Sequence, residues 1–305
     1  MASKSKSKIY IGMGGWELHP FNLHFFPRKK PKDFRKLQYY CQYFDTVEIN
    51  VTFYKNLLND EQPRKWMEDV SENKNFIFTV KLFHGFTHTY DATTRDVHAV
   101  QQMLDRFSME NKLGGLIIQF PFSFVNGADE RKYLGRLAEA FSQYRAFVEL
   151  RHDSWNKPAL FEFLQKNNLH YVNVDLPKLE HHMPFHEKAW DNVAYFRMMG
   201  RNTKTWKEPW RLEEDKQHMV SDRYLYKYDD SELLELLKRV ERVRKLADII
   251  YVIYHNDPNA NSLFNGFKLR HLIENKKVNI PERLIKVHPD LARIAAPVDS
   301  KDSLF

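Results

Sequence analysis

Short runs of apolar, β-branched and aromatic residues recur along the chain, and amphipathic or connecting segments separate most of them. Runs of this kind are typical of strands that are buried on both faces. Eight of them are predicted to be strands: Ile9–Trp16, Thr46–Asn50, Phe76–Leu82, Leu116–Phe120, Ala146–Arg151, His170–Asp175, Val193–Gly200 and Ile249–Asn256.

Apolar residues at helical spacing lie between these strands. The predicted helices are Pro31–Phe44, Asp60–Val70, Thr94–Glu110, Asp129–Tyr144, Lys157–Asn167 and Ser231–Ala247. The last has the clearest i, i+3, i+4 stripe, and Ser231 is expected to cap it. Strands that alternate with helices indicate a parallel sheet. Eight such units over about 250 residues predict one (β/α)8 barrel of the TIM type, with a doubly wound open sheet as the alternative.

The predicted organisation is a disordered basic N-terminus over residues 1–8, the barrel over 9–275 and a C-terminal extension over 276–305. No repeat or flexible linker divides the chain. Two connections are long, Leu176–Asn192 and Arg201–Tyr228, and both follow predicted strands. In a barrel they would lie over the mouth, the end at which the strands terminate and where active sites are built.

The stretch "TVEINVTFY", from Thr46 to Tyr54, shows strand alternation most clearly. Its apolar row is Val47, Ile49, Val51 and Phe53, and its polar row is Glu48, Asn50 and Thr52. Successive side chains of a strand point to opposite faces, so the polar row shares one face. The composition suits the interior of a domain. We therefore expect Glu48 to belong to the wall of a polar site.

Polar residues also stand at the C-terminal ends of the other predicted strands. They are Lys81, Gln119, Glu149, Arg151, Asn173, Asp175, Arg197, His255 and Asn256. The first strand ends in glycines and Trp16, which leaves room for a ligand. Buried charges are costly unless they are used or paired. The ring of polar ends predicts a ligand site at the mouth, whereas Glu149 with Arg151 alone is equally compatible with an inert ion pair.

Composition and charge indicate which partners and which cellular compartment to expect. Aromatic residues reach 14%, and 47 Lys and Arg against 40 Asp and Glu give a formal net charge of +7, a modest excess that favours anionic partners. The single cysteine, Cys41, excludes an internal disulfide and is expected to be a buried small hydrophobe. The start "MASKSKSK" is no signal peptide, and no stretch is apolar enough for a membrane span. We expect a cytoplasmic protein.

The strand ends resemble a known family. The similarity runs from about Ile9 to Phe264 and rests on "GMGGW", "FFP", "FDTVEINVTFY", "KLFHGFTH", "LGGLIIQFPFSF", "VELRHDSW", "FRMMGR", "YLYKY" and "HNDPNANSL". In this order the motifs resemble the DUF72 (YecE-like) family, whose fold is a TIM barrel. The resemblance implies functional positions at Gly12, Gly15, Trp16, Glu48, Asn50, Thr52, Tyr54, Lys81, His88, Gln119, Glu149, Arg151, His152, Trp155, Asp175, Arg197, Gly200, Arg201 and Asn256.

This chain departs from the family pattern in places. The first motif usually reads like GTSGW, and Met13 and Gly14 stand where two hydroxyl residues are usual. That argues against phosphate binding by side chains of the first strand. Met199 replaces the usual histidine before "GR", and His255 replaces the first of two asparagines, which argues against catalysis by these two positions.

The first functional hypothesis is an enzyme that acts on a phosphate-bearing substrate. Lys81, Arg151, Arg197 and Arg201 would bind the anion, since arginine suits bidentate phosphate contacts. Glu149 and Glu48 would be the catalytic acid and base, which requires different pKa values. The remaining predicted substrate contacts are Trp16, Asn50, His88, Gln119, His152, Trp155, Asp175, His255 and Asn256. A nucleic-acid phosphodiester is one version, with phosphate contacts from Pro27–Lys36 and base stacking on Trp155, Trp206 and Trp210.

Two alternatives stay open. A sugar isomerase or epimerase would hold Mg or Mn on Glu48, Glu149, Asp175 and His255. The flanking arginines argue against this site, because cations repel a metal. A non-catalytic protein would instead use the mouth to bind a small anion or nucleotide. His181, His182 and His186 have a spacing similar to metal ligands, but we interpret them as surface polar residues, and we predict no cofactor or metal firmly.

Overall fold

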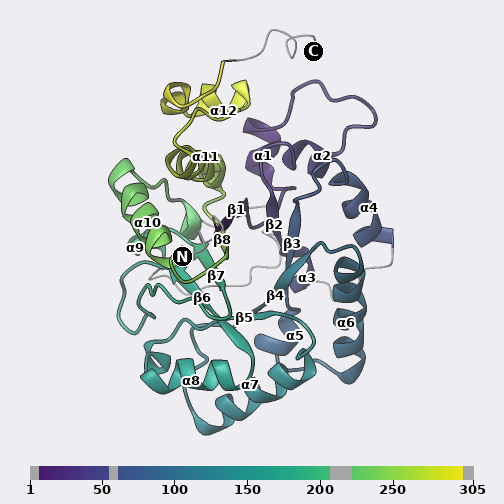
Figure 1. The fold of residues 1–305 in the computed structure, drawn as a ribbon, viewed down its shortest axis with the longest axis vertical. Coiled ribbons are helices and arrows are strands. Elements are labelled where there is room, and N and C mark those ends of the chain that lie inside the picture. Colours follow the sequence, from purple (N-terminus) through teal and green to yellow (C-terminus); the bar gives the residue numbers. More distant parts are fainter. Residues whose placement is uncertain (1–6, 55–60, 207–221, 298–305) are drawn as a thin grey trace, which may run out of the picture.

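The computed structural model describes residues 7–54, 61–206 and 222–297. Within it, eight parallel strands form a closed barrel in chain order (Figure 1). They are β1 (Lys8–Met13), β2 (Thr46–Ile49), β3 (Ile77–Lys81), β4 (Leu113–Gln119), β5 (Ala146–Glu149), β6 (Leu169–Asp175), β7 (Val193–Met198) and β8 (Ile249–Tyr254). Because β1 pairs with β8, the barrel prediction is confirmed and the open sheet is wrong.

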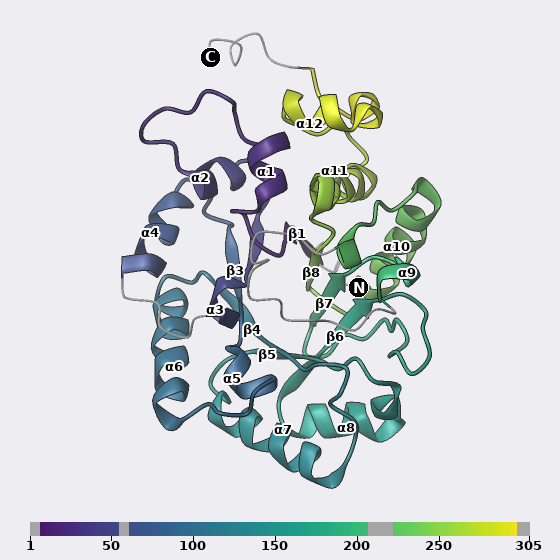
Figure 2. The same cartoon turned by 180° about the vertical axis from the view of Figure 1, so that it is seen from behind.

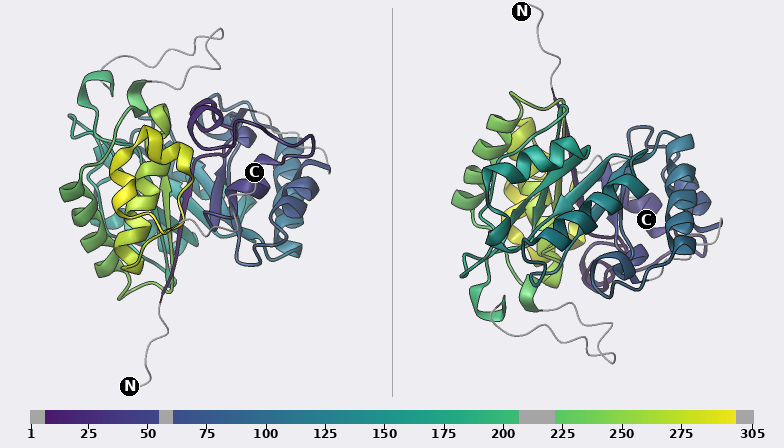
Figure 3. Two further views of the ribbon diagram at one scale, coloured as in Figure 1. Left: turned by 90° about the horizontal axis from the view of Figure 1, so that it is seen from above. Right: turned by 90° about the horizontal axis from the view of Figure 1, so that it is seen from below.

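Helices surround the barrel, as the views from behind, from above and from below show (Figures 2 and 3). They are α1 (His19–His24), α2 (Lys36–Tyr40), α3 (Val51–Tyr54), α4 (Glu61–Asp69), α5 (His84–Thr87), α6 (Thr94–Met109), α7 (Ala128–Ala140), α8 (Pro158–Lys166), α9 (Thr203–Trp206), α10 (Asp230–Val243), α11 (Asn261–Glu274) and α12 (Glu282–Val287). The helix α11 packs against β1 and β8. No helix of the described residues is long and apolar enough to cross a membrane.

Two local predictions are wrong. The alternation of "TVEINVTFY" does not continue as a strand, because β2 ends at Ile49 and α3 follows at once. The Thr52 hydroxyl lies 3.0 Å from the carbonyl oxygen of Ile49 and 2.6 Å from that of Lys81, and these contacts fix the turn. The cap of α10 is Asp229 rather than Ser231: its carboxylate accepts the Glu232 amide proton in a capping box.

Besides a small cluster of Val174, Leu176, Met199 and Trp206, two larger apolar cores fill the described part of the molecule. One lies between the strands and the helices, and there Cys41 is buried, as predicted. The other fills the lower barrel interior and comprises Tyr10, Ile117, Phe147, Val172, Val193, Tyr195, Tyr251 and Ile253. The rings of Tyr10 and Tyr251 stack with centroids 5.1 Å apart. The barrel is therefore closed from below, and a ligand can approach its polar residues only at the mouth.

The predicted termini fall mostly at or beyond the edge of the described part. Of the N-terminal residues 1–8, residues 1–6 lie outside it, and Lys8 already begins β1. Of the C-terminal extension, residues 276–297 are described and contain α12, whereas 298–305 lie outside. The two long connections follow β6 and β7 as predicted, and residues 207–221 of the second lie outside the described part.

Candidate functional site at the mouth of the barrel

A buried ion-pair cluster forms the floor of the mouth. Arg197, at the end of β7 and 2% exposed, donates to Glu48 through Nε at 3.0 Å and through Nη2 at 2.7 Å. Its Nη1 donates to Oε2 of Glu149. Each guanidinium nitrogen thus meets a carboxylate, and both carboxylates are fully buried. We call Glu48, Arg197 and Glu149 the floor triad.

The floor triad keeps both of its acids ionised. Burial alone would raise the pKa of Glu149, but the charges of Arg197 and Arg151 outweigh it and lower the pKa to about 2. Burial likewise opposes the charge of Glu48, and Arg197 and His255 shift its pKa well below the usual value. Because both shifts have the same direction, the two glutamates lack the opposed pKa values that separate acid and base roles require.

Hydroxyl groups support the floor triad from beneath. Tyr195 donates its hydroxyl proton to Glu48 Oε2 at 3.1 Å, and Thr79 Oγ1 lies 2.8 Å from the same tyrosine oxygen. The sequence interpretation missed Tyr195 and Thr79. Period-two spacing could have found Tyr195, because it lies two positions before Arg197 and so faces the same interior.

His255 and Asn50 flank Glu48. His255 Nε2 lies 3.6 Å from Glu48 Oε1, and Asn50 donates to the Gly14 carbonyl at 2.8 Å. A Cβ on Gly14 would lie 2.3 Å from His255 Nδ1, so only glycine leaves space for this ring. Burial lowers the pKa of His255, and the Arg197 charge adds to this effect.

Two accessible cations lie above the floor triad. Arg151 donates through Nε to Glu149 Oε1 at 2.7 Å, and its side chain is 14% exposed. Lys81, at the end of β3, is partly exposed, and its Nζ lies 3.8 Å from the centroid of the Phe53 ring. Lys81 forms no ion pair with a carboxylate in the part of the chain that the structure describes. Arg151 and Lys81 are the cations that an incoming ligand can reach.

Histidines and aromatic rings form the rim around these cations. His88 packs edge-on against Phe53 at 4.9 Å, and burial followed by the charge of Lys81 lowers its pKa to about 4. On the other side, the exposed ring of Phe122 contacts His152 at 4.9 Å and His182 at 5.1 Å. These rings offer flat apolar faces beside the cations.

Trp206 continues the rim on the side of α9. Its ring meets His182 at 5.9 Å, and the Arg151 guanidinium lies 5.8 Å from its centroid. Gln119, at the end of β4, is buried and donates to the neighbouring carbonyl of Phe120. Trp210, which we predicted could stack on bases, lies outside the described residues.

Several predicted contacts lie away from the mouth. Trp16 packs edge-on against Trp66 in the outer core with centroids 5.1 Å apart. Trp155 is 1% exposed, stacks on Phe124 and donates its indole proton to the Phe124 carbonyl. Asn256 is fully buried and accepts from Asn265 on α11. A ligand at the floor triad would not meet these side chains.

Asp175 and Arg201 form a second cluster outside the barrel wall. Val172 of β6 belongs to the interior core, so Asp175, three residues later, points to the opposite face. There Arg201 donates to Asp175 at 2.9 Å and reaches Glu232 and Glu235 of α10 at 3.1 and 3.4 Å. We call these four residues the outer clamp. The prediction that Asp175 and Arg201 face the mouth is wrong.

Because of this placement, the residues of the predicted metal site do not lie together. Asp175 does not share a face with Glu48 and Glu149, and both glutamates are already bonded to Arg197. The four oxygen and nitrogen ligands that Mg or Mn would need do not converge here.

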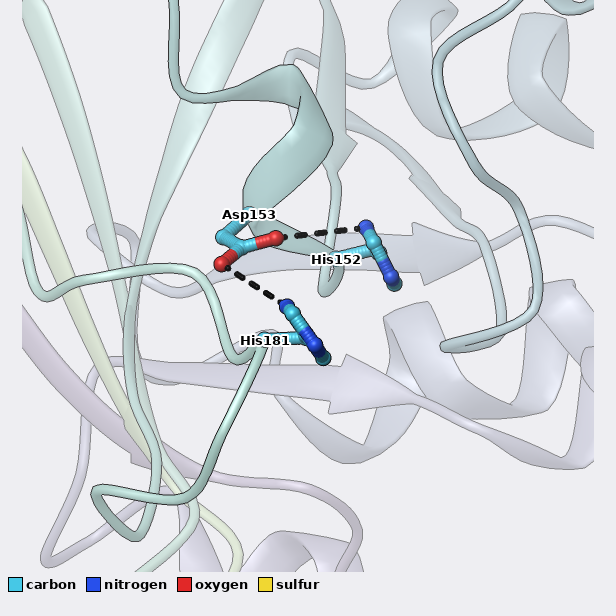
Figure 4. Close-up of side chains that lie close together, drawn as sticks. All are labelled: His152, Asp153 and His181. Carbon is cyan, nitrogen blue, oxygen red and sulfur yellow. Dashed lines mark hydrogen bonds and ion pairs between the residues drawn. The ribbon is translucent and has the colours of Figure 1, made fainter.

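His152, Asp153 and His181 do converge, at the rim (Figure 4). The two imidazole rings are parallel, with centroids 5.6 Å apart, and Asp153 lies 3.5 Å from one and 3.4 Å from the other. His152 Nδ1 already accepts the Ser154 amide proton at 3.1 Å. This bond occupies the nitrogen that a metal would need, so we interpret the group as a hydrogen-bonded rim cluster. Of the predicted histidine cluster, His181 is exposed, and His182 and His186 are partly exposed.

Comparison with known proteins gives a consistent result. The family model described as "Protein of unknown function DUF72" matches residues 10–289. The UPF0759 protein YunF of Bacillus subtilis (strain 168) is 26% identical over 280 residues, which cover 87% of this chain and 95% of that protein.

Solved structures show the same fold. The crystal structure of a DUF72 family protein from Thermotoga maritima MSB8 superposes with a TM-score of 0.71 at 24% identity, covering 87% of this chain and 99% of that one. A DUF72 family protein from Enterococcus faecalis V583 gives a TM-score of 0.74 at 22% identity, covering 89% and 97%.

Proposed function

Because the chain belongs to the DUF72 family, whose description assigns no reaction, we propose a function from the geometry of the mouth: an enzyme that acts on a phosphate-bearing substrate. The observation that supports it is a pair of accessible cations, Lys81 and Arg151, above a floor whose charges are already matched.

Charge counting supports an anionic ligand. Glu48 and Glu149 contribute two negative charges, and Arg197 and Arg151 contribute two positive charges, so these four groups cancel. Lys81 is the surplus cation when it is protonated. Arg151 uses Nε for Glu149 and forms no hydrogen bond through its terminal nitrogens to the described residues. A phosphate group would take up those terminal nitrogens, which suit its planar, two-point recognition.

Arg197 has a different role from the one that its sequence position predicts. Its three nitrogens are engaged by Glu48 and Glu149, and it is buried beneath the other cations. We assign it to the floor as the charge that holds both acids in place. Arg201 is assigned to the outer clamp because it pairs with Asp175 and Glu232 outside the barrel wall.

In this proposal the carboxylate that acts on the substrate is that of Glu149 rather than that of Glu48. Glu149 touches both the floor and the accessible Arg151, whereas Glu48 lies below and is also bonded by Tyr195. An ionised carboxylate with a pKa near 2 is a weak base and an effective electrostatic partner for a developing positive charge. It cannot serve as a general acid at neutral pH.

The test begins with binding. Phenyl phosphate should raise the melting temperature of the parent protein, and phenol at the same concentration should not. At pH 6, where Lys81 is protonated, Lys81→Met and Arg151→Met should each reduce the shift, because a charge-assisted hydrogen bond is worth about 1.5–3 kcal/mol. Lys65→Met, a solvent-exposed lysine on α4, is the matched control and should respond as the parent does. Equal responses in all variants would refute an anion site at the mouth.

Turnover is tested separately with p-nitrophenyl phosphate mono- and diesters and with oligonucleotides. Activity that falls in Glu149→Gln supports the enzyme. If phenyl phosphate raises the melting temperature and no ester is hydrolysed, the supported function is that of a non-catalytic anion-binding protein. Nucleic-acid binding by the rim and by residues 27–36 should weaken steeply with salt, because bound phosphates release counterions. Nucleic-acid binding that does not depend on salt concentration would exclude the nucleic-acid version of the proposal.

A further inference from the structure

We propose that Lys81 is a nucleophilic amine that forms an imine with the carbonyl carbon of a phosphorylated aldehyde or ketone. The phosphate part of this inference rests on the proposed function, because Arg151 would hold that group. The amine part rests on the surroundings of Lys81 alone.

The backbone holds Lys81 at a fixed height in the mouth. It is the last residue of β3 and pairs in register with Ile117 of β4, and the next amide, that of Leu82, donates to the Ile117 carbonyl at 2.9 Å. The Lys81 carbonyl lies 2.6 Å from the Thr52 hydroxyl of α3. The flexible part of the residue is therefore its side chain only, which limits where the amine can reach.

The side chain lies against an apolar surface. Its Nζ sits 3.8 Å from the centroid of Phe53, a ring that is itself 7% exposed. Within the described ranges the amine has no hydrogen-bonded or ion-paired partner. A lysine that served the fold would be expected to form such a pair, as Lys268 does with Asp230 at 2.7 Å.

Charged groups from β2, β5, β7 and the C-terminal end of α5 surround this amine. Glu48 comes from β2, Arg197 from β7, Glu149 and Arg151 from the end of β5, and His88 from the end of α5. The two carboxylates are already neutralised by the two arginines, so they offer little net attraction. His88 is held neutral. The charges of these groups cancel, so a third positive charge, on Lys81, gains no net attraction that would offset its burial.

The protonation state follows from this arrangement. Burial, and then the Arg197 charge, lower the pKa of Lys81 to about 7. Near pH 7.5 the amine is then mostly neutral, whereas an ordinary lysine, with a pKa of about 10.4, is neutral in roughly one molecule in a thousand. Desolvation beside other cations is the known way to make a lysine nucleophilic. Binding a phosphate would be served better by a permanent charge, and Arg151 already supplies one.

The covalent step balances without any added oxidant or reductant. The Lys81 nitrogen lone pair attacks the carbonyl carbon, a C–N bond forms, and the carbonyl π electrons move to oxygen. The nitrogen loses one proton and the oxygen gains one, which gives a carbinolamine. The hydroxyl then leaves as water while C=N forms, so amine plus carbonyl gives imine plus water. Glu149 and Arg151, on the neighbouring wall, would hold the substrate during these transfers.

The experiment uses pyridoxal 5′-phosphate as a probe that carries both an aldehyde and a phosphate. The full-length protein is treated at pH 7.5, reduced with borohydride and mapped by peptide mass spectrometry. Lys81 should be labelled roughly 100-fold faster than exposed Lys65, because a larger fraction of it is neutral. Pyridoxal, which lacks the phosphate, should label Lys81 about tenfold more slowly, as loss of one charged hydrogen bond predicts.

Variants separate the possible results. Lys81→Met has no amine and cannot form the imine, so fast labelling should vanish while Lys65 reacts unchanged. Arg151→Met should slow labelling by the phosphate probe only. Labelling of Lys81 no faster than that of Lys65 would overturn the inference, and it would leave the proposed function intact if phenyl phosphate still protects the protein. Equal labelling of Lys81 by both probes would support the amine and refute the phosphate site.

Discussion

Arg197 and Arg201 lie four residues apart at the end of β7, yet they belong to different parts of the molecule. Arg197 points into the barrel, is 2% exposed and bridges two fully buried acids, Glu48 and Glu149. Arg201 points outward, its side chain is 24% exposed, and it ties β6 to α10 through Asp175, Glu232 and Glu235. The same residue type thus holds the floor of a site in one place and the packing of a helix in the other.

This difference shows why an arginine count at strand ends does not identify an anion site. Both guanidinium groups are paired with carboxylates: Arg197 uses all three nitrogens, and Arg201 uses Nε and Nη1 outside the barrel wall. The accessible cations are those at the next level, Lys81 and Arg151. An unmatched cation marks a binding site better than a buried one, because a buried charge needs its partners to fold.

The largest expected effect comes from Arg197→Met. It leaves Glu48 and Glu149 buried without a counter-charge between them, so the free energy of unfolding should fall by about 5 kcal/mol. Urea denaturation measures it. A triple variant, Arg197→Met with Glu48→Gln and Glu149→Gln, should recover part of the loss. A single variant as stable as the parent would show that the floor triad is not the buried ion pair described above.

Glu149→Gln should cost less, about 3 kcal/mol, because Arg197 keeps Glu48 as a partner. The cost depends on pH. The folded-state pKa of Glu149 is lowered to about 2, so its contribution is present above the unfolded pKa of about 4.3 and is lost as pH falls through 2. The melting temperatures of the parent and Glu149→Gln should therefore converge between pH 4.5 and 2. A constant difference over this range would contradict the assignment.

Arg201→Met should lower stability by about 1.5 kcal/mol, since the exposed side of its network is screened by water. Hydrogen exchange in α10 should rise, while the response to phenyl phosphate should stay that of the parent. A loss of ligand response in this variant would place the outer clamp in the site after all.

Lys81→Met is expected to change stability with the opposite sign, and only at pH values where the lysine is protonated. Because the folded-state pKa of Lys81 is lowered to about 7, protonating it disfavours the fold, and this cost is complete below pH 7 and fades as pH rises toward 10.4. The variant should melt slightly above the parent at pH 6 and match it near pH 10. Melting temperatures measured between pH 6 and pH 10 distinguish this trend from a difference that does not depend on pH.

The barrel and the composition of its floor could be predicted from the sequence, because alternation places Glu48 on a fixed face and strand ends meet at one edge. Which side chains of β6 face the barrel axis could not be predicted. Val172 and Val174 alternate with Asn173 and Asp175, and both sets are buried, so hydrophobicity alone does not say which faces the axis. Here Val172 lies in the barrel interior, and Arg201, which follows β7, supplies the charge that compensates Asp175.

The solvent exposure of individual side chains could not be predicted from the sequence either. The motif position of Trp16 gives no sign that its ring turns toward Trp66, and no sequence pattern shows that Arg197 is covered while Arg151 is not. These outcomes depend on side chains brought together from strands far apart in the chain. The short helix α3 was missed for a similar reason, since Thr52 bonds to β3 rather than within its own segment.

The central claim is that the mouth binds a phosphate through Arg151 and not through Arg197 or Arg201. Calorimetric titration of phenyl phosphate into the parent, Arg151→Met and Arg201→Met tests it most directly. The account predicts equal affinity for the parent and Arg201→Met and at least about tenfold weaker binding for Arg151→Met. Parent-like affinity in Arg151→Met, or an equal loss in both variants, would contradict it.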